Sequence, residues 1–184
     1  ESKDIPLTTN VTLMPKYDGI SLCVKEQLRQ GWTRGDGTVG QRSHDHFQEI
    51  HTNEISVDIT TWGEAIIPRE KFNQNHSDDW KNPRNLVAGK FNDKTPNPEI
   101  LCDVDYVRYG MKSDSSVFKT KSAQLEYLNN LQISQVPYLI KPISELTSDN
   151  LKELFIEWNV KYELDGLIIE IDDIELQEEL GREK

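Results

Sequence analysis

The sequence contains one lysine whose neighbours suggest nucleophilic chemistry, in the segment Pro15-Lys16-Tyr17-Asp18-Gly19. A lysine attacks an electrophile only as the neutral amine. Because the free side chain has a pKa of about 10.4, a nearby cation or desolvation has to favour that form. The glycine turn that follows would let the backbone of a ligand approach closely. Taken alone, a K-x-D-G pattern is more often a solvated lysine beside a turn, so other segments must decide between the two interpretations.

A glycine-rich segment, Thr33-Arg34-Gly35-Asp36-Gly37-Thr38-Val39-Gly40, could hold an anion. Three glycines within six residues let main-chain N–H groups reach a phosphate, and Arg34 adds a forked donor. The spacing matches neither the phosphate loop that ends in G-K-[S/T] nor the G-x-G-x-x-G fingerprint of dinucleotide-binding folds. The alternative interpretation is a hairpin loop that binds nothing.

Three further segments place a charged side chain beside a glycine or at the start of a helix. They are Trp62-Gly63-Glu64, Asn82-Pro83-Arg84-Asn85 and Leu164-Asp165-Gly166-Leu167-Ile168-Ile169. The first sets an acid in a strand after a glycine, the second an arginine near a helix N-terminus, and the third an acid at the mouth of a hydrophobic strand. Each is common outside functional sites, so only their combination is informative.

The hydrophobic pattern predicts the elements that position these segments. Alternating apolar and polar residues predict strands over residues 11–34, which puts Lys16 at a strand-to-turn junction. The remaining predictions are a strand pair over 55–67, a short helix from Pro68, a helix opened by Asn82-Pro83, a strand over 101–109, helices over 120–131 and 147–158, a buried strand over 164–171 and an acidic helix ending at residue 180. The predicted fold class is therefore α+β, with strands dominant in the first half.

Length and charge limit the function classes. The chain has 184 residues, of which 35% are hydrophobic and 29% charged, as expected for one domain, and no apolar stretch approaches the roughly 18 residues of a membrane helix. The net charge is −11, and residues 145–184 hold 13 Asp and Glu against 4 Lys and Arg, which leaves −2 for residues 1–144. Since non-specific nucleic-acid affinity comes mainly from Lys and Arg, such a chain would not grip a long duplex alone.

Cysteine, histidine and the N-terminal segment indicate a cytoplasmic setting. The two cysteines, Cys23 and Cys102, cannot form a disulfide framework and favour a reducing compartment. The N-terminal residues have neither the apolar core of a secretory signal nor the Arg-rich character of a transit peptide. His44 and His46 have no third ligand at metal spacing. We therefore expect a cytoplasmic protein with no membrane segment and no metal site built by its own side chains.

Taken in order, the five segments resemble the adenylation (nucleotidyltransferase) domain of NAD-dependent DNA ligases over about residues 13–181. Other nucleotidyl-transferring ligases and capping enzymes share K-x-D-G, but T-R-G-D-G-T, N-P-R-N and the D-G before a strand together indicate the NAD-dependent branch. The resemblance implies an ATP-grasp-like nucleotidyltransferase fold of antiparallel sheets flanked by helices. It also implies a single adenylation domain over residues 1–184. That domain would end before the family's last lysine motif and would lack the family's nicotinamide-mononucleotide-binding and DNA-binding domains.

The resemblance further implies a covalent mechanism that seals nicks in DNA, as in replication and repair. Lys16 would attack the α-phosphate of NAD, expel nicotinamide mononucleotide and hold AMP through a phosphoramide bond. The AMP would pass to the 5′-phosphate of nicked duplex DNA, and the 3′-hydroxyl would then displace it. Arg34 and bound Mg²⁺ are the cations that would favour the neutral amine.

The family's site residues carry over onto matching positions of this chain. Asp18 would orient the lysine or a metal ion, Arg34 would contact the nucleotide ribose or a DNA phosphate, and Glu64 would bind the ribose. Tyr109 would stack on adenine. The whole implied cofactor-binding set is Lys16, Arg34, Glu64, Arg84, Tyr109, Asp165 and Gly166.

Four positions depart from the family pattern where charge is handled, namely Met14, Trp62, Asn92 and Glu170. Met14 replaces a glutamate, whereas Trp62 and Asn92 replace arginines, and Lys90 lies close enough to substitute for the second. Glu170 replaces a strand lysine. Its carboxylate would repel a phosphate, unless it helps to coordinate Mg²⁺.

These departures leave two alternatives to an enzyme that forms lysyl-AMP. One is a catalytically impaired nucleotide-binding or assembly subunit of a multi-chain ligase, and the other is a nucleoside-triphosphate-dependent ligase of DNA or RNA. The resemblance is compatible with a piece of a longer ligase or with one subunit of a ligase divided over several chains, as a compact viral or phage genome could encode. Activity is expected to require further domains or a second ligase subunit, which would supply most contacts to DNA.

Overall fold

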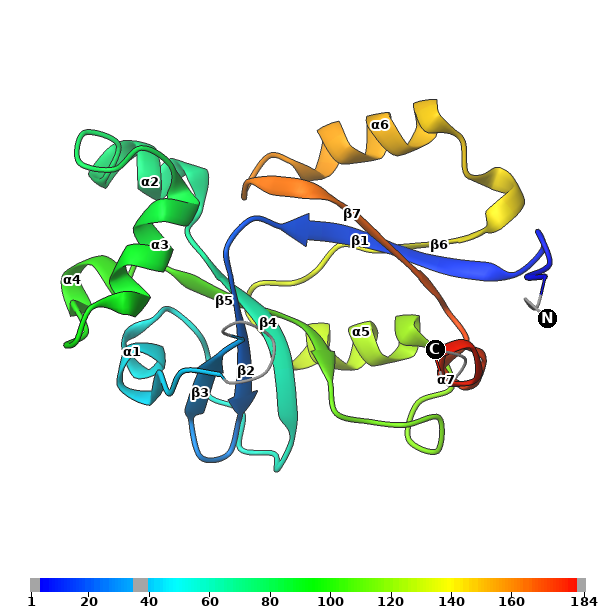
Figure 1. The fold of residues 1–184 in the computed structure, drawn as a ribbon, viewed down its shortest axis with the longest axis horizontal. Helices are drawn as coiled ribbons and strands as arrows, with labels where there is room; N and C mark the ends of the chain where they lie inside the picture. The colour runs from blue at the N-terminus through cyan, green and yellow to red at the C-terminus, as the bar shows by residue number, and fades with distance from the viewer. Residues whose placement is uncertain (1–3, 35–39, 182–184) are drawn as a thin grey trace.

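Two antiparallel sheets and the helices around them form the fold (Figure 1). The structure, a computed structural model, describes residues 4–34 and 40–181. One sheet has three strands in the order β6-β1-β7, and the other has four in the order β3-β2-β4-β5. This arrangement confirms the predicted combination of antiparallel sheets and helices.

The three-stranded sheet holds the lysine of the K-x-D-G segment. Its central strand, β1 (Asn10–Tyr17), ends one residue after Lys16. It pairs with β6 (Leu139–Pro142) on one side and with β7 (Leu164–Ile171) on the other. The bounds of β7 match the prediction, but the strand is mostly half-buried rather than buried, because it lies at the edge of this sheet.

The four-stranded sheet contains β2 (Ile20–Lys25), β3 (Gln30–Thr33), β4 (Thr60–Ile66) and β5 (Asp105–Met111). The prediction of a strand pair over residues 55–67 is wrong, since that range contains β4 alone. Residues 55–59 lie outside any strand because tertiary contacts hold them, including burial of the Ile55 side chain.

The predicted strand over residues 101–109 begins four residues too early. A short helix, α4 (Pro98–Leu101), precedes β5 because the Asn97 side chain accepts the N–H of Ile100 and so caps a new helical turn. Leu101 is fully buried from that helix, which explains why its apolar character looked like the start of a strand.

The predicted helices that open at Asn82-Pro83, Thr120 and Thr147 begin within one residue of those positions, and the predicted acidic helix ends at Gly181, one residue after the predicted end. The bounds of the helices are α1 (His44–Glu49), α2 (Arg69–Asn75), α3 (Pro83–Asn92), α5 (Lys121–Leu131), α6 (Ser148–Trp158) and α7 (Ile174–Gly181), with a 3-10 turn, η1 (Ile143–Glu145). Asn82, Thr120 and Thr147 each cap the helix that follows by accepting a main-chain N–H. Among the described helices, none has the length and apolar character required to cross a membrane.

Three apolar clusters hold the layers together. The first packs α1, α2, α3 and α4 against one face of the four-stranded sheet, and includes Phe47, Phe72, Leu86 and Leu101. The second joins the two sheets with α5, through residues such as Met14, Ile66, Val107 and Leu125. The third packs α6 on the outer face of the three-stranded sheet, through Leu13 and Leu154. The space between the two sheets is therefore fixed from both sides.

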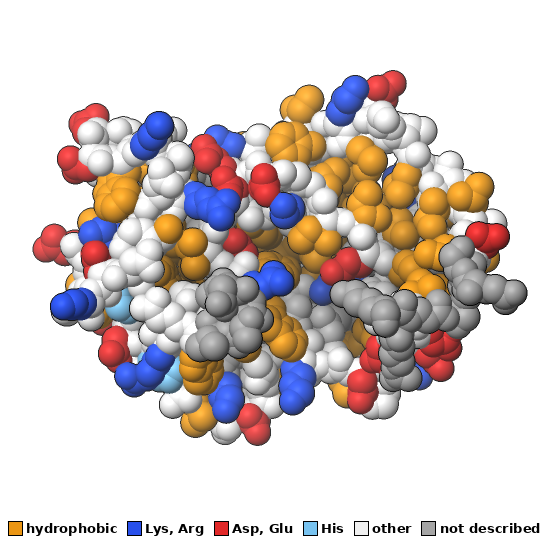
Figure 2. Space-filling model, viewed as in Figure 1, with side chains coloured by type: hydrophobic (Ala, Val, Ile, Leu, Met, Phe, Trp, Pro, Cys, Tyr) orange, Lys and Arg blue, Asp and Glu red, His pale blue; other side chains and the backbone are white. Residues whose placement is uncertain are grey.

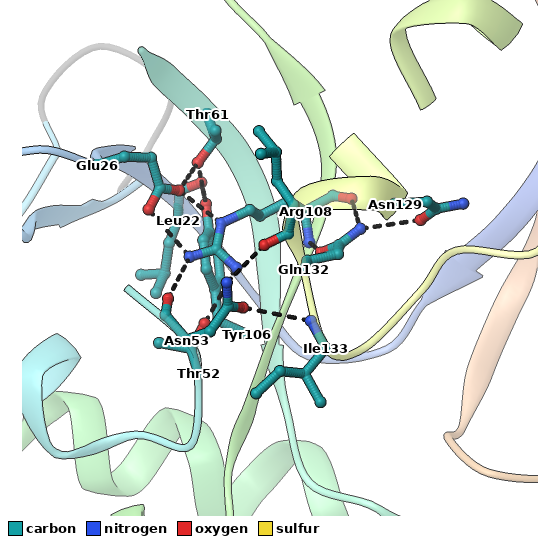
Figure 3. Close-up of polar contacts among 11 residues, drawn as sticks. Leu22, Glu26, Thr52, Asn53, Thr61, Tyr106, Arg108, Asn129, Gln132 and Ile133 are labelled. Atoms are coloured by element: carbon teal, nitrogen blue, oxygen red, sulfur yellow. Dashed lines mark hydrogen bonds and ion pairs between the residues drawn. The ribbon is translucent and has the colours of Figure 1, made fainter. Parts of the chain in front are cut away.

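A buried ion pair ties β5 to the end of β2 (Figure 3). Arg108 and Glu26 are 1% and 2% exposed, and Nε and Nη2 of Arg108 donate to the two carboxylate oxygens at 2.6 and 2.9 Å. Thr61 donates to the same carboxylate at 2.5 Å, and the Gln132 side-chain amide bonds both the N–H and the carbonyl of Arg108. The strands that carry Glu64 and Tyr109 are thus held in one register.

Candidate active site

A cavity of about 560 Å³ lies between the two sheets beside α3. Seven residues that the sequence analysis singled out line it, although they are far apart in the sequence. They are Lys16, Asp18, Arg34, Glu64, Arg84, Tyr109 and Asp165. Figure 2 shows acidic and basic side chains side by side around a hollow on this face of the molecule.

Lys16 reaches the rim of the cavity from the end of β1. Its ammonium contacts the carboxylate of Asp165 in β7 at 2.5 Å, and both side chains are 53% exposed. This contact lowers the pKa of Asp165. Because an exposed ion pair contributes little to stability, the amine can be released from it at small cost. The described neighbours of Lys16 therefore include a carboxylate, whereas the neutral amine predicted from the sequence requires a nearby cation or burial.

Two glycines are required by the backbone around the lysine. Gly19 has no room for a side chain, since a Cβ there would lie 2.4 Å from the carbonyl oxygen of Ala65 and 2.9 Å from Cγ of Glu64. Gly166 pairs with Lys16 and has a φ of +157°, which a residue with a side chain rarely adopts. Gly19 thus lets the turn after β1 pass close to β4, whereas Gly166 supplies a backbone conformation within the β1–β7 ladder.

Glu64 is the buried acid of the cavity. Its carboxylate accepts hydrogen bonds from the N–H of Gly19 at 3.2 Å, from the hydroxyl of Ser21 at 3.1 Å and from the hydroxyl of Tyr109 at 3.3 Å. Burial raises the pKa of Glu64 to about 7, because it outweighs these hydrogen bonds and the charge of Arg84. Burial and the nearby Glu64 raise the pKa of Tyr109 to about 12. Glu64 can therefore either accept or donate a hydrogen bond near neutral pH.

Arg84 and Asp18 form a second ion pair on the rim. Pro83 starts α3 and the Asn82 side chain caps it, which places Arg84 in the first turn facing the K-x-D-G segment. Nη1 of Arg84 lies 3.0 Å from the Asp18 carboxylate. The charge of Arg84 also contributes to the lowered pKa of Asp165. Two cations and two carboxylates therefore alternate around the opening.

Arg34 approaches the cavity from the end of β3. Its main-chain N–H donates to the carbonyl of Ser21 at 3.1 Å, and its side chain is exposed. Residues 35–39 of the glycine-rich segment lie outside the described residues, so the anion cradle stays a prediction.

The four departures from the family pattern have different surroundings. Met14 is buried between the sheets, and Asn92 lines the cavity. Lys90 forms an ion pair with Asp93 at 2.8 Å and lies over the Trp80 ring, so it is directed to neighbours on its own side of α3. Trp62 is exposed on the four-stranded sheet.

Glu170 lies beside a buried amine. Its carboxylate is 3.7 Å from Nζ of Lys121, which also donates to the carbonyl of Tyr109 at 2.7 Å. Burial lowers the pKa of Lys121, and the charge of Glu170 opposes that shift. The carboxylate therefore partly compensates an internal positive charge, and its coordination of Mg²⁺ stays a prediction.

Sequence reasoning missed several further cavity residues, among them Ser21, Ala88 and Phe91. Ser21 could have been found, since it follows Gly19 by two residues in a strand and so shares its face. The two apolar residues carry no such signal, because in a sequence they are indistinguishable from core.

The histidines noted in the sequence bind main-chain oxygens. His44 and His46 contact the carbonyls of Gly31 and Asp93 at 2.8 and 3.0 Å. Within residues 4–34 and 40–181, no group of three or more His, Cys, Asp or Glu is placed to hold a metal ion.

Comparison with known proteins finds similar sequences along the chain. The family model for the NAD-dependent DNA ligase adenylation domain matches residues 2–184. The chain is 33% identical over 183 residues to a DNA ligase of Aliarcobacter butzleri (strain RM4018), which covers 91% of this chain and 28% of that protein. It is 30% identical over 189 residues to DNA ligases of Bacillus cereus (strain AH820) and Bacillus anthracis (strain A0248), which covers 90% of this chain and 27% of each of them. The chain thus spans little more than a quarter of the length of these relatives.

Proposed function

The chain belongs to the family of NAD-dependent DNA ligase adenylation domains, and we propose that it forms a covalent lysyl-AMP at Lys16 and passes the AMP to the 5′-phosphate of nicked DNA. The observation that carries this proposal is the cavity itself, where a lysine, two arginines and a buried acid from distant segments meet. A space of about 560 Å³ is of the size that holds a nucleotide-sized ligand.

The first step is an attack of Lys16 Nζ on the adenylyl phosphorus of NAD. The new N–P bond replaces the P–O bond to nicotinamide mononucleotide, which leaves with the electron pair, and the amine loses a proton. The contact with Asp165 must open first. Asp165 then remains within reach of the amine and can take up its proton.

The other cavity residues have proposed roles in holding the adenylate. Glu64 binds the ribose hydroxyls, and its environment lets it accept or donate a hydrogen bond. Tyr109 stacks on the adenine, while Arg84 and Arg34 neutralise phosphate charge as it shifts to the leaving group. Asp18 orients Lys16 by holding Arg84 beside it. Gly166 leaves space beside the adenine.

Mg²⁺ is part of the proposal as a partner of the dinucleotide phosphates. This ion usually keeps several waters and binds one or two carboxylates together with substrate phosphates. Asp18 and Asp165 at the rim are suited to that arrangement, which needs no cluster of three protein ligands. Mg²⁺ would supply charge neutralisation at the phosphates.

The second step transfers AMP to DNA. An oxygen of the DNA 5′-phosphate attacks the AMP phosphorus, the P–N bond breaks, and Lys16 regains a proton. The 3′-hydroxyl then attacks the DNA phosphorus and AMP leaves. We propose that these steps occur in the cytoplasm, with other domains or a second subunit gripping the duplex, because the chain is acidic overall.

The fold assignment and the domain limits are also proposals. We assign the two sheets and their helices to the ATP-grasp-like nucleotidyltransferase class, and residues 1–184 to one adenylation domain. The joint lining of the cavity by both sheets supports a single unit, since neither sheet alone holds the site.

One observation favours a second candidate, a subunit that binds nucleotide without catalysis. Glu170 places a carboxylate beside Lys121, where the resemblance implies a lysine that would favour phosphate. A use of a nucleoside triphosphate in place of NAD is the third candidate, which K-x-D-G alone would permit.

Intact-mass spectrometry tests the proposal. The chain is incubated with Mg²⁺ and either NAD or ATP, with and without an N-terminal module or partner chain, and Lys16→Ala is the control. One adenylyl adduct that requires NAD and Lys16 is the expected result. An adduct formed only from ATP would select the third candidate. Absence of an adduct from the completed assembly, while nucleotide still binds, would select the second.

A further inference from the structure

Two tryptophans and a cysteine form a row on the four-stranded sheet. Cys23 in β2 pairs with Trp32 in β3 on one side and with Trp62 in β4 on the other. Residues paired directly across antiparallel strands point to the same face. The intervening residues Leu22 and Val24 are buried on the opposite face. The row therefore lies opposite the face that α1–α4 cover, and only Trp32, in the edge strand β3, also packs against the ring of His44 at the start of α1, with the ring centres 4.6 Å apart.

The neighbouring rows of this face carry cations. Lys25 follows Cys23 by two residues and pairs with Thr60, whose carbonyl accepts the N–H of Lys112. On the other side of the row, the main-chain N–H of Arg34 donates a hydrogen bond to the carbonyl of Ser21. We call the following six residues the tryptophan face: Trp32, Cys23, Trp62, Lys25, Lys112 and Arg34.

The tryptophan face is accessible and positively charged. Trp62 is 41% exposed, the three cationic side chains are exposed, and Nζ of Lys25 lies 5.7 Å from the centre of the Trp32 ring. The six residues carry three positive charges and no negative one, although the chain as a whole has a net charge of −11. Figure 2 shows Lys and Arg side chains, with an acidic side chain among them, over the lower ends of β2, β3 and β4. The charge of this face is therefore complementary to a polyanion.

This face is continuous with the cavity. Ser21 and Glu64 form the next pair on this face of β2 and β4, two residues from Cys23 and Trp62, and both line the cavity. Two strand residues span about 7 Å, which is about two steps of 3.4 Å along a DNA strand. A strand whose end lies in the cavity would reach Trp62 within its first nucleotides.

We propose that the tryptophan face binds the DNA strand that enters the cavity. Trp62 and Trp32 pack on its bases or sugars, and Lys25, Lys112 and Arg34 lie against its phosphates. Aromatic side chains interleaved with cations bind single strands with little sequence preference, since every base offers a π-face. The inference rests on the proposed function, because DNA is the substrate which that function brings to the cavity.

Cys23 provides a direct probe of the tryptophan face. In a Cys102→Ser background it is the sole thiol, and its rate of maleimide labelling is measured at alkaline pH, since burial raises the pKa of Cys23. Nicked duplex DNA, single-stranded DNA, RNA of the same sequence and NAD are compared as protecting ligands. We expect DNA to slow the labelling of Cys23 at least about fivefold, because bases stacked on Trp32 and Trp62 would cover the cysteine between them.

Substitutions then test the individual contacts by fluorescence polarisation with labelled nicked DNA. Trp62→Ala is expected to weaken binding by roughly five- to a hundred-fold. Lys25→Gln together with Lys112→Gln is expected to lower the slope of log affinity against log salt by roughly 1.4 to 1.8, the effect of two lost phosphate contacts. Ile156→Ala and Lys152→Gln on α6 are matched controls, exposed on another part of the surface. Urea unfolding confirms that each variant is folded.

Three results would overturn the inference. The first is DNA binding by the Trp62 and lysine variants that equals that of the α6 controls. The second is protection of Cys23 by NAD and not by DNA, which would mean that the dinucleotide binds this face. The third is protection of Cys23 by RNA in preference to DNA. Protection of Cys23 by DNA without a Lys16 adduct would support this inference while contradicting the proposed chemistry, so the two failures are distinguishable.

Discussion

Replacing Arg108 with methionine should strongly destabilise the fold, because it leaves the Glu26 carboxylate buried without its cation. Arg108 donates to both oxygens of Glu26, to the hydroxyl of Thr52 and to the carbonyl of Asn53. Removing one partner of such a buried pair costs about 3 to 5 kcal/mol. That is a large fraction of the roughly 5 to 15 kcal/mol that stabilises a typical domain.

Urea unfolding followed by tryptophan fluorescence measures this cost. With a slope of about 2 kcal/mol per molar urea, the loss corresponds to a fall of about 2 M in the unfolding midpoint. The double variant Glu26→Leu, Arg108→Met removes both charges and should recover most of the loss, since an apolar pair of similar volume is often neutral to stability.

Two outcomes would refute this reasoning. The first is a midpoint shift below about 0.5 M for Arg108→Met, which would mean that water or another group compensates Glu26. The second is a double variant as unstable as the single one, which would mean that the hydrogen bonds to Asn53 and Thr52, and not the uncompensated charge, decide the stability. Lys152→Met on the exposed surface of α6 is the matched control and should leave the midpoint unchanged.

Three further predictions concern the cavity and its supports. Burial raises the folded-state pKa of Glu64 to about 7, so the folded protein holds the Glu64 proton more tightly than the unfolded chain does. The free energy of unfolding therefore includes the full contribution of this proton below about pH 4.5 and loses it as pH rises through 7, by roughly 3 kcal/mol in total. Glu64→Gln should flatten this part of the stability profile measured by urea unfolding between pH 5 and pH 8, and an unchanged profile would contradict the burial argument. Gly19→Ala should destabilise the fold by more than about 1 kcal/mol, since its Cβ would meet the Ala65 carbonyl at 2.4 Å. A wild-type thermal midpoint would show that the turn before β2 can move away from β4. Asn82→Ala should cost about 1 kcal/mol by removing the cap of α3, with Asn82→Asp as the variant that restores the urea midpoint, and equal midpoints for both would argue against the cap.

Local signals explain which elements could be predicted. The helices over 120–131 and 147–158 have a threonine cap followed by apolar residues at helical spacing, and both are confirmed. The strand over 164–171 is short and β-branched, and its bounds are confirmed. The error at residues 55–59 arises because their alternation resembles that of β4, whereas this segment precedes the strand and buries its Ile55 side chain in the fold.

Some features of the candidate site could likewise be predicted from local sequence signals, and others could not. Short motifs identified Lys16, Glu64 and Arg84 because glycine, proline and charge stand within a few residues of one another. The contact between Lys16 and Asp165 could not be predicted, since it depends on the register of strands almost 150 residues apart. The pairing of Glu26 with Arg108 was equally hidden, because nothing local distinguishes a buried charge from a solvated one.

The position of β1 has a consequence for the order of assembly. Both strands that flank it, β6 and β7, come from residues after 138, so Lys16, the proposed nucleophile, lies near the start of the described chain and the strands that support it lie near the end. Closing a loop of that length is entropically costly, so sequence-local hairpins such as β2–β3 form sooner than the β1–β7 ladder. A chain emerging from the ribosome therefore exposes Lys16 long before it can be aligned with Asp165. In the proposed function, reactivity towards a nucleotide would require the β1–β7 pairing, so adduct formation would report on completed folding.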